Sequence, residues 1–356
     1  MAARKQRSRR GQRSPRGAPG APWWLSLSEQ ELLGVRLCEL GLGIEGTALE
    51  SRIEQLMGEL ARAGLCFRPS IWLSTDWFSP SGVPGFALPF YLAHPRLARL
   101  EGTQMFEVEG GNRDWCMNLL RHEAGHAIDT AYRLRRKKGW RKCFGSPAES
   151  YYTTYTPRPT SRYFVHNLDN WYAQSHPIED FAETFAVWLK PRSRWRTRYA
   201  GWPALAKLEY VDELMEEIGE RPPPVRSRER TDSLSQLRTT LGQYYLRKKK
   251  HYGQEDRSVY DRDLYRLFTD DPSQARRRLA AAFLRDRRVE LRRVVAQWSG
   301  QYRFVVDQVL RSMMVRSRDL RLYLAYSERE TAEGAAVLLT VHTMRLIRRR
   351  HAAYFR

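Results

Sequence analysis

The stretch RHEAGHAIDTAY, residues 121–132, lies in a strong helical pattern and carries the main chemical signal of this chain. It places His122, Glu123 and His126 in the spacing His-Glu-x-x-His. Two histidines four residues apart lie on one face of a helix, so both imidazoles can reach one metal ion. The glutamate between them can face a water molecule bound on that ion. The alternative is a pair of surface histidines on an ordinary helix.

A second segment supplies the carboxylates that such a site needs. Residues 171–189 read WYAQSHPIEDFAETFAVWL and predict a helix over 178–189. A catalytic zinc needs a third protein ligand and an open position for water, and a carboxylate on a following helix meets the first need. Glu179 begins this helix. Glu183, one turn later, can accept a hydrogen bond from a ligating imidazole and fix its tautomer. A solvated acidic patch is the alternative.

Two further histidines compete for the role of ligand. His176 lies three residues before Glu179 and could share its face. Pro177 stands between them and favours the first position of a helix, so we expect His176 to precede the helix and to point elsewhere. His166, in FVHNLDN, is expected to be a loop histidine.

The two motifs together resemble a known group of enzymes. The pattern HEAGHAID followed by Tyr-x6-Glu-x-Phe-Ala is similar to the gluzincin peptidases related to the anthrax lethal factor catalytic domain and to the Mlc titration factor. It is most similar to the bacterial family of putative zinc-binding metallopeptidases, over about residues 105–190. The resemblance implies a zincin-like peptidase domain with zinc as cofactor. It also implies Glu179 as the third ligand and Tyr172 as a donor to the oxyanion, although Tyr172 could equally be one more packed tyrosine.

The distribution of charge divides the chain of 356 residues. The formal net charge is +21, yet residues 23–220 are close to neutral, and the excess belongs to the two ends. Residues 1–22 are rich in Arg, Gly and Pro and predict a disordered basic arm. Residues 221–233 contain three prolines among charges and predict a linker. We therefore expect a metallopeptidase domain over 23–220 and a basic helical domain over 234–356.

The expected fold class is α+β. A capping box at Ser28 to Glu31 predicts a helix through LLGVRLCEL, and a second helix is expected over 47–63. Short apolar runs between Leu65 and Gly111 predict a small sheet, and residues 112–136 predict the helix of the histidines. Phe106 to Glu109 are expected to form an edge strand to which an extended peptide substrate could add.

The C-terminal domain predicts four or five amphipathic helices and no convincing strand. Its Lys/Arg clusters alternate with tyrosines, a composition that would attract nucleic acid or another polyanion. No specific nucleic-acid-binding motif accompanies them, so solvated basic helix faces are the alternative. A protein that binds anionic polymers and holds a structural or silent metal is the competing function. A protease recruited to nucleic-acid-bound proteins would combine both functions.

The remaining features concern the compartment. The four cysteines form no CxxC pair and indicate reduced thiols. No apolar run is long enough for a membrane span, and no apolar segment follows the basic N-terminus as in a secretory signal. We expect a cytoplasmic zinc peptidase that acts on peptides or proteins.

Overall fold

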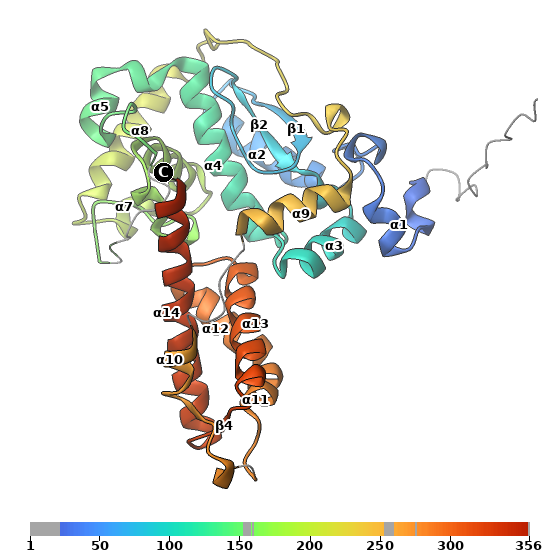
Figure 1. Cartoon of the computed structure of the whole chain (residues 1–356). Coiled ribbons are helices and arrows are strands. Elements are labelled where there is room, and N and C mark those ends of the chain that lie inside the picture. The colour runs from blue at the N-terminus through green and yellow to red at the C-terminus, as the bar shows by residue number, and fades with distance from the viewer. Residues whose placement is uncertain (1–21, 152–157, 159, 253–259, 275, 355–356) are drawn as a thin grey trace, which may run out of the picture.

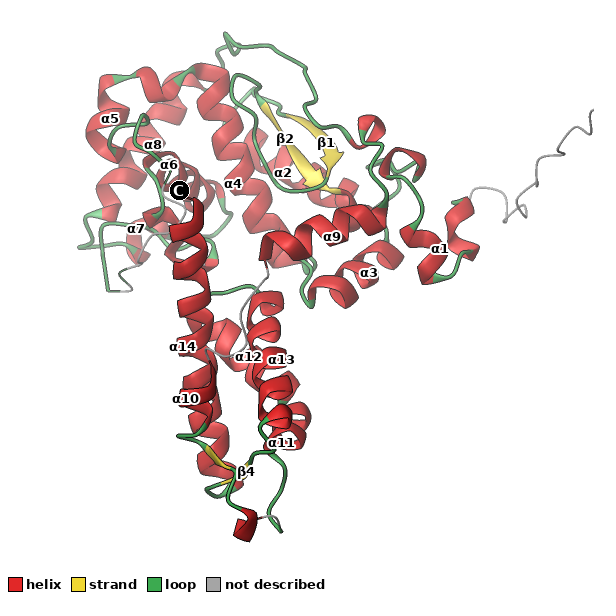
Figure 2. Cartoon of the chain, in the orientation of Figure 1, coloured by secondary structure: helices red, strands yellow, loops and turns green. Residues whose placement is uncertain are grey.

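The computed structural model describes residues 22–151, 158, 160–252, 260–274 and 276–354. The predicted basic arm falls outside these ranges except for Pro22. The described residues are mostly helical and include two small two-stranded sheets (Figure 2). This composition agrees with the predicted α+β class.

The first helices follow their sequence signals only in part. Helix α1 (Glu29–Leu33) begins at the predicted capping box, in which Glu31 N–H donates to Ser28 Oγ at 3.2 Å. It ends at Gly34, so LLGVRLCEL does not form one helix as predicted; a short 3-10 turn covers Leu37–Glu39. Helix α2 (Ala48–Arg62) agrees with the helix predicted over 47–63.

A parallel pair of strands forms the small sheet beside the histidine helix. Strands β1 (Ser70–Ser74) and β2 (Gly85–Pro89) pair with Ser70 opposite Gly85. A Cβ at Gly85 would lie 2.3 Å from the carbonyl oxygen of Ser70, so the pairing needs glycine there. All five residues of β2 are buried. The loop between the strands returns along β2, where Phe78 makes an antiparallel bridge to Ala87.

The predicted edge strand at Phe106 to Glu109 is wrong. Helix α3 (Pro95–Met105) occupies the preceding residues, with His94 as its N-cap. Phe106 ends that helix in the left-handed conformation, with φ 64°, and the chain then turns through Gly110. The alternating pattern was misleading because the buried Met105 belongs to the last turn of a helix rather than to one face of a strand.

The two helices that carry the site motifs are both present. Helix α4 (Arg113–Tyr132) ends before the predicted boundary at 136, because Arg133 adopts φ 56° and a short 3-10 turn follows. Helix α6 (Pro177–Leu189) agrees with the predicted helix. The same part of the chain also contains α5 (Lys138–Phe144), α7 (Trp195–Arg198), α8 (Ala204–Ile218) and α9 (Leu241–Tyr252).

The C-terminal helices form an elongated bundle that projects from the rest of the molecule (Figure 1). They are α10 (Asp261–Leu264), α11 (Ala280–Asp286), α12 (Arg288–Ser299), α13 (Arg303–Asp319) and α14 (Glu328–Tyr354). The sequence predicted helices here and no strand. Two short strands, β3 (Phe268–Thr269) and β4 (Tyr323–Leu324), nevertheless pair antiparallel.

The apolar core consists of one large cluster around the small sheet and α4, a second within the C-terminal bundle, and smaller satellites. The predicted linker 221–233 packs against the first part: Trp72 donates to the carbonyl of Thr231 at 2.9 Å. Leu241 and Tyr245 of α9 also belong to the large cluster. Along the chain, the boundary between the two main apolar clusters therefore lies after α9, later than the predicted linker. The division into domains stays a prediction.

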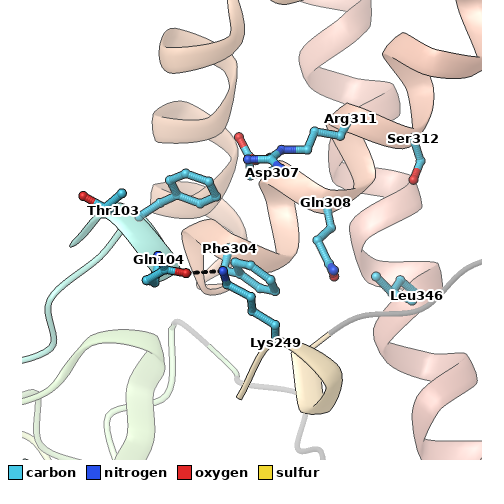
Figure 3. Close-up of a pocket in the computed structure, with 10 residues that line it drawn as sticks. Thr103, Gln104, Lys249, Phe304, Asp307, Gln308, Arg311, Ser312 and Leu346 are labelled. Atoms are coloured by element: carbon cyan, nitrogen blue, oxygen red, sulfur yellow. Dashed lines mark hydrogen bonds and ion pairs between the residues drawn. The ribbon is translucent and has the colours of Figure 1, made fainter. Parts of the chain in front are cut away.

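The bundle meets the first part of the molecule at Phe106. Its ring stacks on Phe304 of α13 with centroids 6.2 Å apart, and the guanidinium of Arg292 lies 4.5 Å from the centroid of the Phe106 ring. A pocket of about 400 Å³ lies at this junction, where Lys249 of α9 donates a hydrogen bond to Gln104 of α3 (Figure 3). None of the predicted site residues lines this pocket.

Candidate metal centre

The close approach of α4 and α6 brings the two sequence motifs together. Asn112 caps α4, and its Oδ1 accepts from Trp115 N–H at 2.8 Å. Gly125 faces α6, where a Cβ would lie 2.9 Å from the Cα of Ala182. Only glycine permits this contact without moving a backbone. The contact places the face of α4 that carries the two histidines beside the first turn of α6.

His122, His126 and Glu179 converge on one point. Glu179 Oε2 lies 3.1 Å from Nε2 of each histidine, and the two Nε2 atoms lie 3.0 Å apart. His122 and Glu179 are 3% and 6% exposed. Within the described residues these three side chains form a group able to hold a metal ion.

The donor set of this group fits zinc. Nδ1–H of His122 donates to Glu183 Oε1 at 2.8 Å, so the neutral imidazole carries its lone pair on Nε2. That lone pair faces Nε2 of His126 and a carboxylate oxygen of Glu179. Electron-pair donors buried this close repel one another unless a cation lies among them. Two imidazoles and one carboxylate are a ligand set of catalytic zinc sites.

Glu183 is fully buried behind His122. Its carboxylate accepts three hydrogen bonds of 2.8 Å, from Nδ1 of His122, from Nδ2 of Asn167 and from the backbone N–H of Leu168. Three donors satisfy the buried charge. They also fix the ring of His122, which is the arrangement expected of a carboxylate that orients a metal ligand.

Glu123 lies on the same helix with only 6% of its surface exposed. Ser79 Oγ donates to Glu123 Oε2 at 3.0 Å, from the loop between β1 and β2. Burial raises the pKa of the Glu123 carboxyl, whereas His126, His122 and the hydrogen bond from Ser79 act in the opposite direction. No sequence pattern singles out Ser79, which is one serine in a loop rich in Ser, Pro and Gly.

Two tyrosines border the centre. The ring of Tyr172 lies beside His122, with centroids 5.6 Å apart. Tyr151 was not predicted as a site residue, yet its hydroxyl donates to Glu179 Oε1 at 3.0 Å. Its position in the tyrosine-rich connection between the two helices was the only signal in the sequence.

His176 does not join the three converging side chains. Its Nδ1 accepts from Ile178 N–H at 3.2 Å and so caps α6, and its Nε2 donates to the carbonyl of Glu149 at 3.0 Å. Both ring nitrogens are therefore engaged, as the position of Pro177 predicted. His166 is also outside the group; its backbone N–H donates to the hydroxyl of Tyr199.

A comparison with protein families finds a match to the segment that contains these side chains. Residues 116–257 match the model of a family described as putative zinc-binding metallo-peptidase. This segment, which is less than half of the chain, is similar to that family and contains the three converging side chains. The match and the ligand group indicate zinc as the cofactor, and a peptidase family implies peptides or proteins as the class of substrate.

The other comparisons add no relative. No curated protein and no solved structure shows a significant match to the chain. None of the helices in the described part of the chain combines the length and the apolar character needed to cross a membrane.

Proposed function

We propose that this protein hydrolyses peptide bonds at a gluzincin-type centre, with His122, His126 and Glu179 as ligands of one zinc ion. The carrying observation is the convergence of one Glu179 oxygen and two imidazole nitrogens, with the carboxylate of Glu123 buried on the same helix. A carboxylate from a following helix as third ligand defines the gluzincin type.

The residues around the proposed zinc position have different roles in the hydrolysis. Bound zinc supplies Lewis acidity toward water and the substrate carbonyl. Glu123 takes the proton from the attacking water and returns it to the leaving amine nitrogen. The burial that raises its pKa makes this carboxylate a better base than an exposed one. Ser79 holds that carboxylate in place by its hydrogen bond.

Tyr172 is proposed to stabilise the developing oxyanion. The proposal is supported by its ring, which lies next to His122 with the ring centroids 5.6 Å apart. A donor directed at developing negative charge in a water-poor site contributes more than it would in water. Glu183 contributes indirectly, since its hydrogen bond fixes the ring of His122.

The test compares two substitutions at the centre. In Glu123→Gln we expect about one zinc per chain to be retained and peptide hydrolysis to fall by at least about 1000-fold, because the amide cannot accept the proton. In Glu179→Ala we expect most of the zinc to be lost. The measurements are elemental analysis and turnover of a quenched-fluorescence peptide library. A fully active Glu123→Gln protein would disprove the mechanism.

We further propose that the enzyme acts in the cytoplasm. The proposal rests on the sequence argument and on the four cysteines, which are all free thiols in the structure: Cys38, Cys66, Cys116 and Cys143. Disulfide bonds would be expected more often in an oxidising compartment.

A further inference from the structure

Tyr151 holds an unusual position relative to the third ligand. Glu179 directs Oε2 to the two histidines, while its other oxygen, Oε1, accepts the hydroxyl of Tyr151 at 3.0 Å. The two oxygens of one carboxylate are thus assigned to different partners. Rotation of the carboxylate about its last bond would break this hydrogen bond.

The ring of Tyr151 is itself held by a well-anchored neighbour. It stacks on the imidazole of His176 with centroids 3.8 Å apart and planes inclined by 10°. His176 cannot turn freely, because it caps α6 through Nδ1 and donates to the carbonyl of Glu149 through Nε2. Stacking on His176 therefore restricts the ring of Tyr151 and so the position of its hydroxyl at Glu179, although Tyr151 as a whole is 58% exposed.

We propose that Tyr151 is a positioning residue for the metal: its hydroxyl restricts Glu179 to binding through Oε2 alone. A carboxylate can bind a metal ion through one or both oxygens. Engaging Oε1 elsewhere favours binding through one oxygen and leaves the fourth coordination position for water. Tyr151 would act on Glu179 as Glu183 acts on His122. This inference rests on the proposed zinc site and adds a determinant of its affinity and geometry.

The test uses Tyr151→Phe, which removes the hydroxyl and keeps the ring on His176. We expect zinc affinity, measured by competition with a chromophoric chelator, to fall by roughly tenfold or more, as for other partners of metal ligands. With Co²⁺ at saturation we expect weaker visible absorption bands, because the released Oε1 can join the ion and raise its coordination number. Cobalt spectra report coordination and need no substrate.

Tyr163→Phe is the matched control. Tyr163 lies in the same connection with 63% of its surface exposed, and we expect its substitution to change neither measurement. If Tyr151→Phe binds zinc as wild type does and gives the wild-type cobalt spectrum, the inference is overturned. A fall in kcat with unchanged metal affinity would also overturn it, since that pattern assigns the hydroxyl to the oxyanion.

The failure of the proposed function would look different. A wild-type chain that takes up neither zinc nor cobalt would remove the metal site itself. A chain that binds zinc and loses it in Glu179→Ala, yet is indifferent to Tyr151→Phe, would leave the site in place and remove only the role of Tyr151.

Discussion

At the scale of single residues, the centre depends on partners that lie far away in the sequence. Glu123 receives its hydrogen bond from Ser79, 44 residues earlier, and Glu179 receives one from Tyr151, 28 residues earlier. Each partner contributes one hydroxyl donor to one carboxylate oxygen. A hydroxyl donor fixes the orientation of a carboxylate without adding a charge, so it leaves the charge balance of the site unchanged.

Glu109 offers a test of how burial affects a carboxylate in this protein. Burial raises the pKa of its carboxyl to about 7, Asp76 adds to the effect, and Lys248 opposes it. Because the folded-state pKa lies above the unfolded value, ionisation of Glu109 costs stability. That cost is absent below about pH 4.5, grows as the pH rises toward 7, and is complete above it.

Replacing Glu109 by Gln should therefore stabilise the protein at pH 8 but not at pH 4.5. We expect a gain of roughly 1 to 3 kcal/mol at the higher pH, since the side chain is only partly buried and solvent screens part of the penalty. Thermal unfolding at the two pH values measures the difference. Glu45→Gln, at an exposed position, is the control and should show no such pH dependence. Equal effects of Glu109→Gln at both pH values would contradict the prediction.

At the scale of elements, the contact between α4 and α6 positions all three proposed ligands. His122 and His126 lie on one helix and Glu179 lies on the other, so a small change in their separation alters the metal site directly. Gly125 sets that separation, because its missing side chain leaves room for the backbone of Ala182.

Gly125→Ala should force the two helices apart. A Cβ 2.9 Å from the Cα of Ala182 meets backbone that cannot rotate away. We expect a loss of about 1 to 3 kcal/mol in the free energy of unfolding, together with weaker zinc binding. Urea denaturation and chelator competition measure the two effects.

Gly58→Ala is the matched control for that substitution. Gly58 lies inside α2, and a Cβ there would meet nothing within 4 Å. We expect it to stabilise the protein by roughly 0.5 to 1 kcal/mol, because alanine favours a helix more than glycine does. If Gly125→Ala also stabilised the protein, the close approach of α4 and α6 would not depend on glycine at this position.

At the scale of the whole molecule, the two main apolar clusters predict two separate unfolding transitions. Phe283 is fully buried in the bundle cluster, and Leu56 is fully buried in the cluster around the small sheet. Phe283→Ala should cost about 3 to 5 kcal/mol and lower only the transition of the bundle. Zinc binding should remain.

Leu56→Ala is the reciprocal change and should lower the other transition. Differential scanning calorimetry with and without zinc assigns each transition, because zinc should raise only the one that contains the site. A single transition shifted as a whole by either substitution would show that the molecule unfolds as one unit.

Several arginines of the bundle are paired with acidic side chains in the structure. Asp307 is fully buried and accepts from Arg288, Arg292 and Arg311, and Arg316 pairs with Asp261 through two hydrogen bonds. Arg288 and Arg292 are largely covered and neutralise the buried Asp307, whereas Arg311 remains exposed. Tyr245, one of the tyrosines that the sequence placed among the basic clusters, is buried in the core. Nucleic-acid binding stays a prediction that these contacts do not favour.

Elements with local signals could be predicted from the sequence alone. The His-Glu-x-x-His spacing is a helix periodicity, Pro177 marks the start of α6, and Ser28 with Glu31 marks the start of α1. His122 and His126 were predicted as ligands from this spacing, whereas Glu179 was predicted from the need of zinc for a third ligand and from the family resemblance. These features depend on neighbours within a few residues or on ligand chemistry.

Only the tertiary structure decided which distant residues meet. The predicted strand at Phe106 to Glu109 is instead the helix end and turn that follow α3, because the choice between strand and helix end depends on what covers Met105. Ser79 and Tyr151 reach the site from loops, which carry no periodicity for a sequence to reveal. Residues 221–252 joined the first cluster because burial depends on the partner surface and not on the composition of the segment alone.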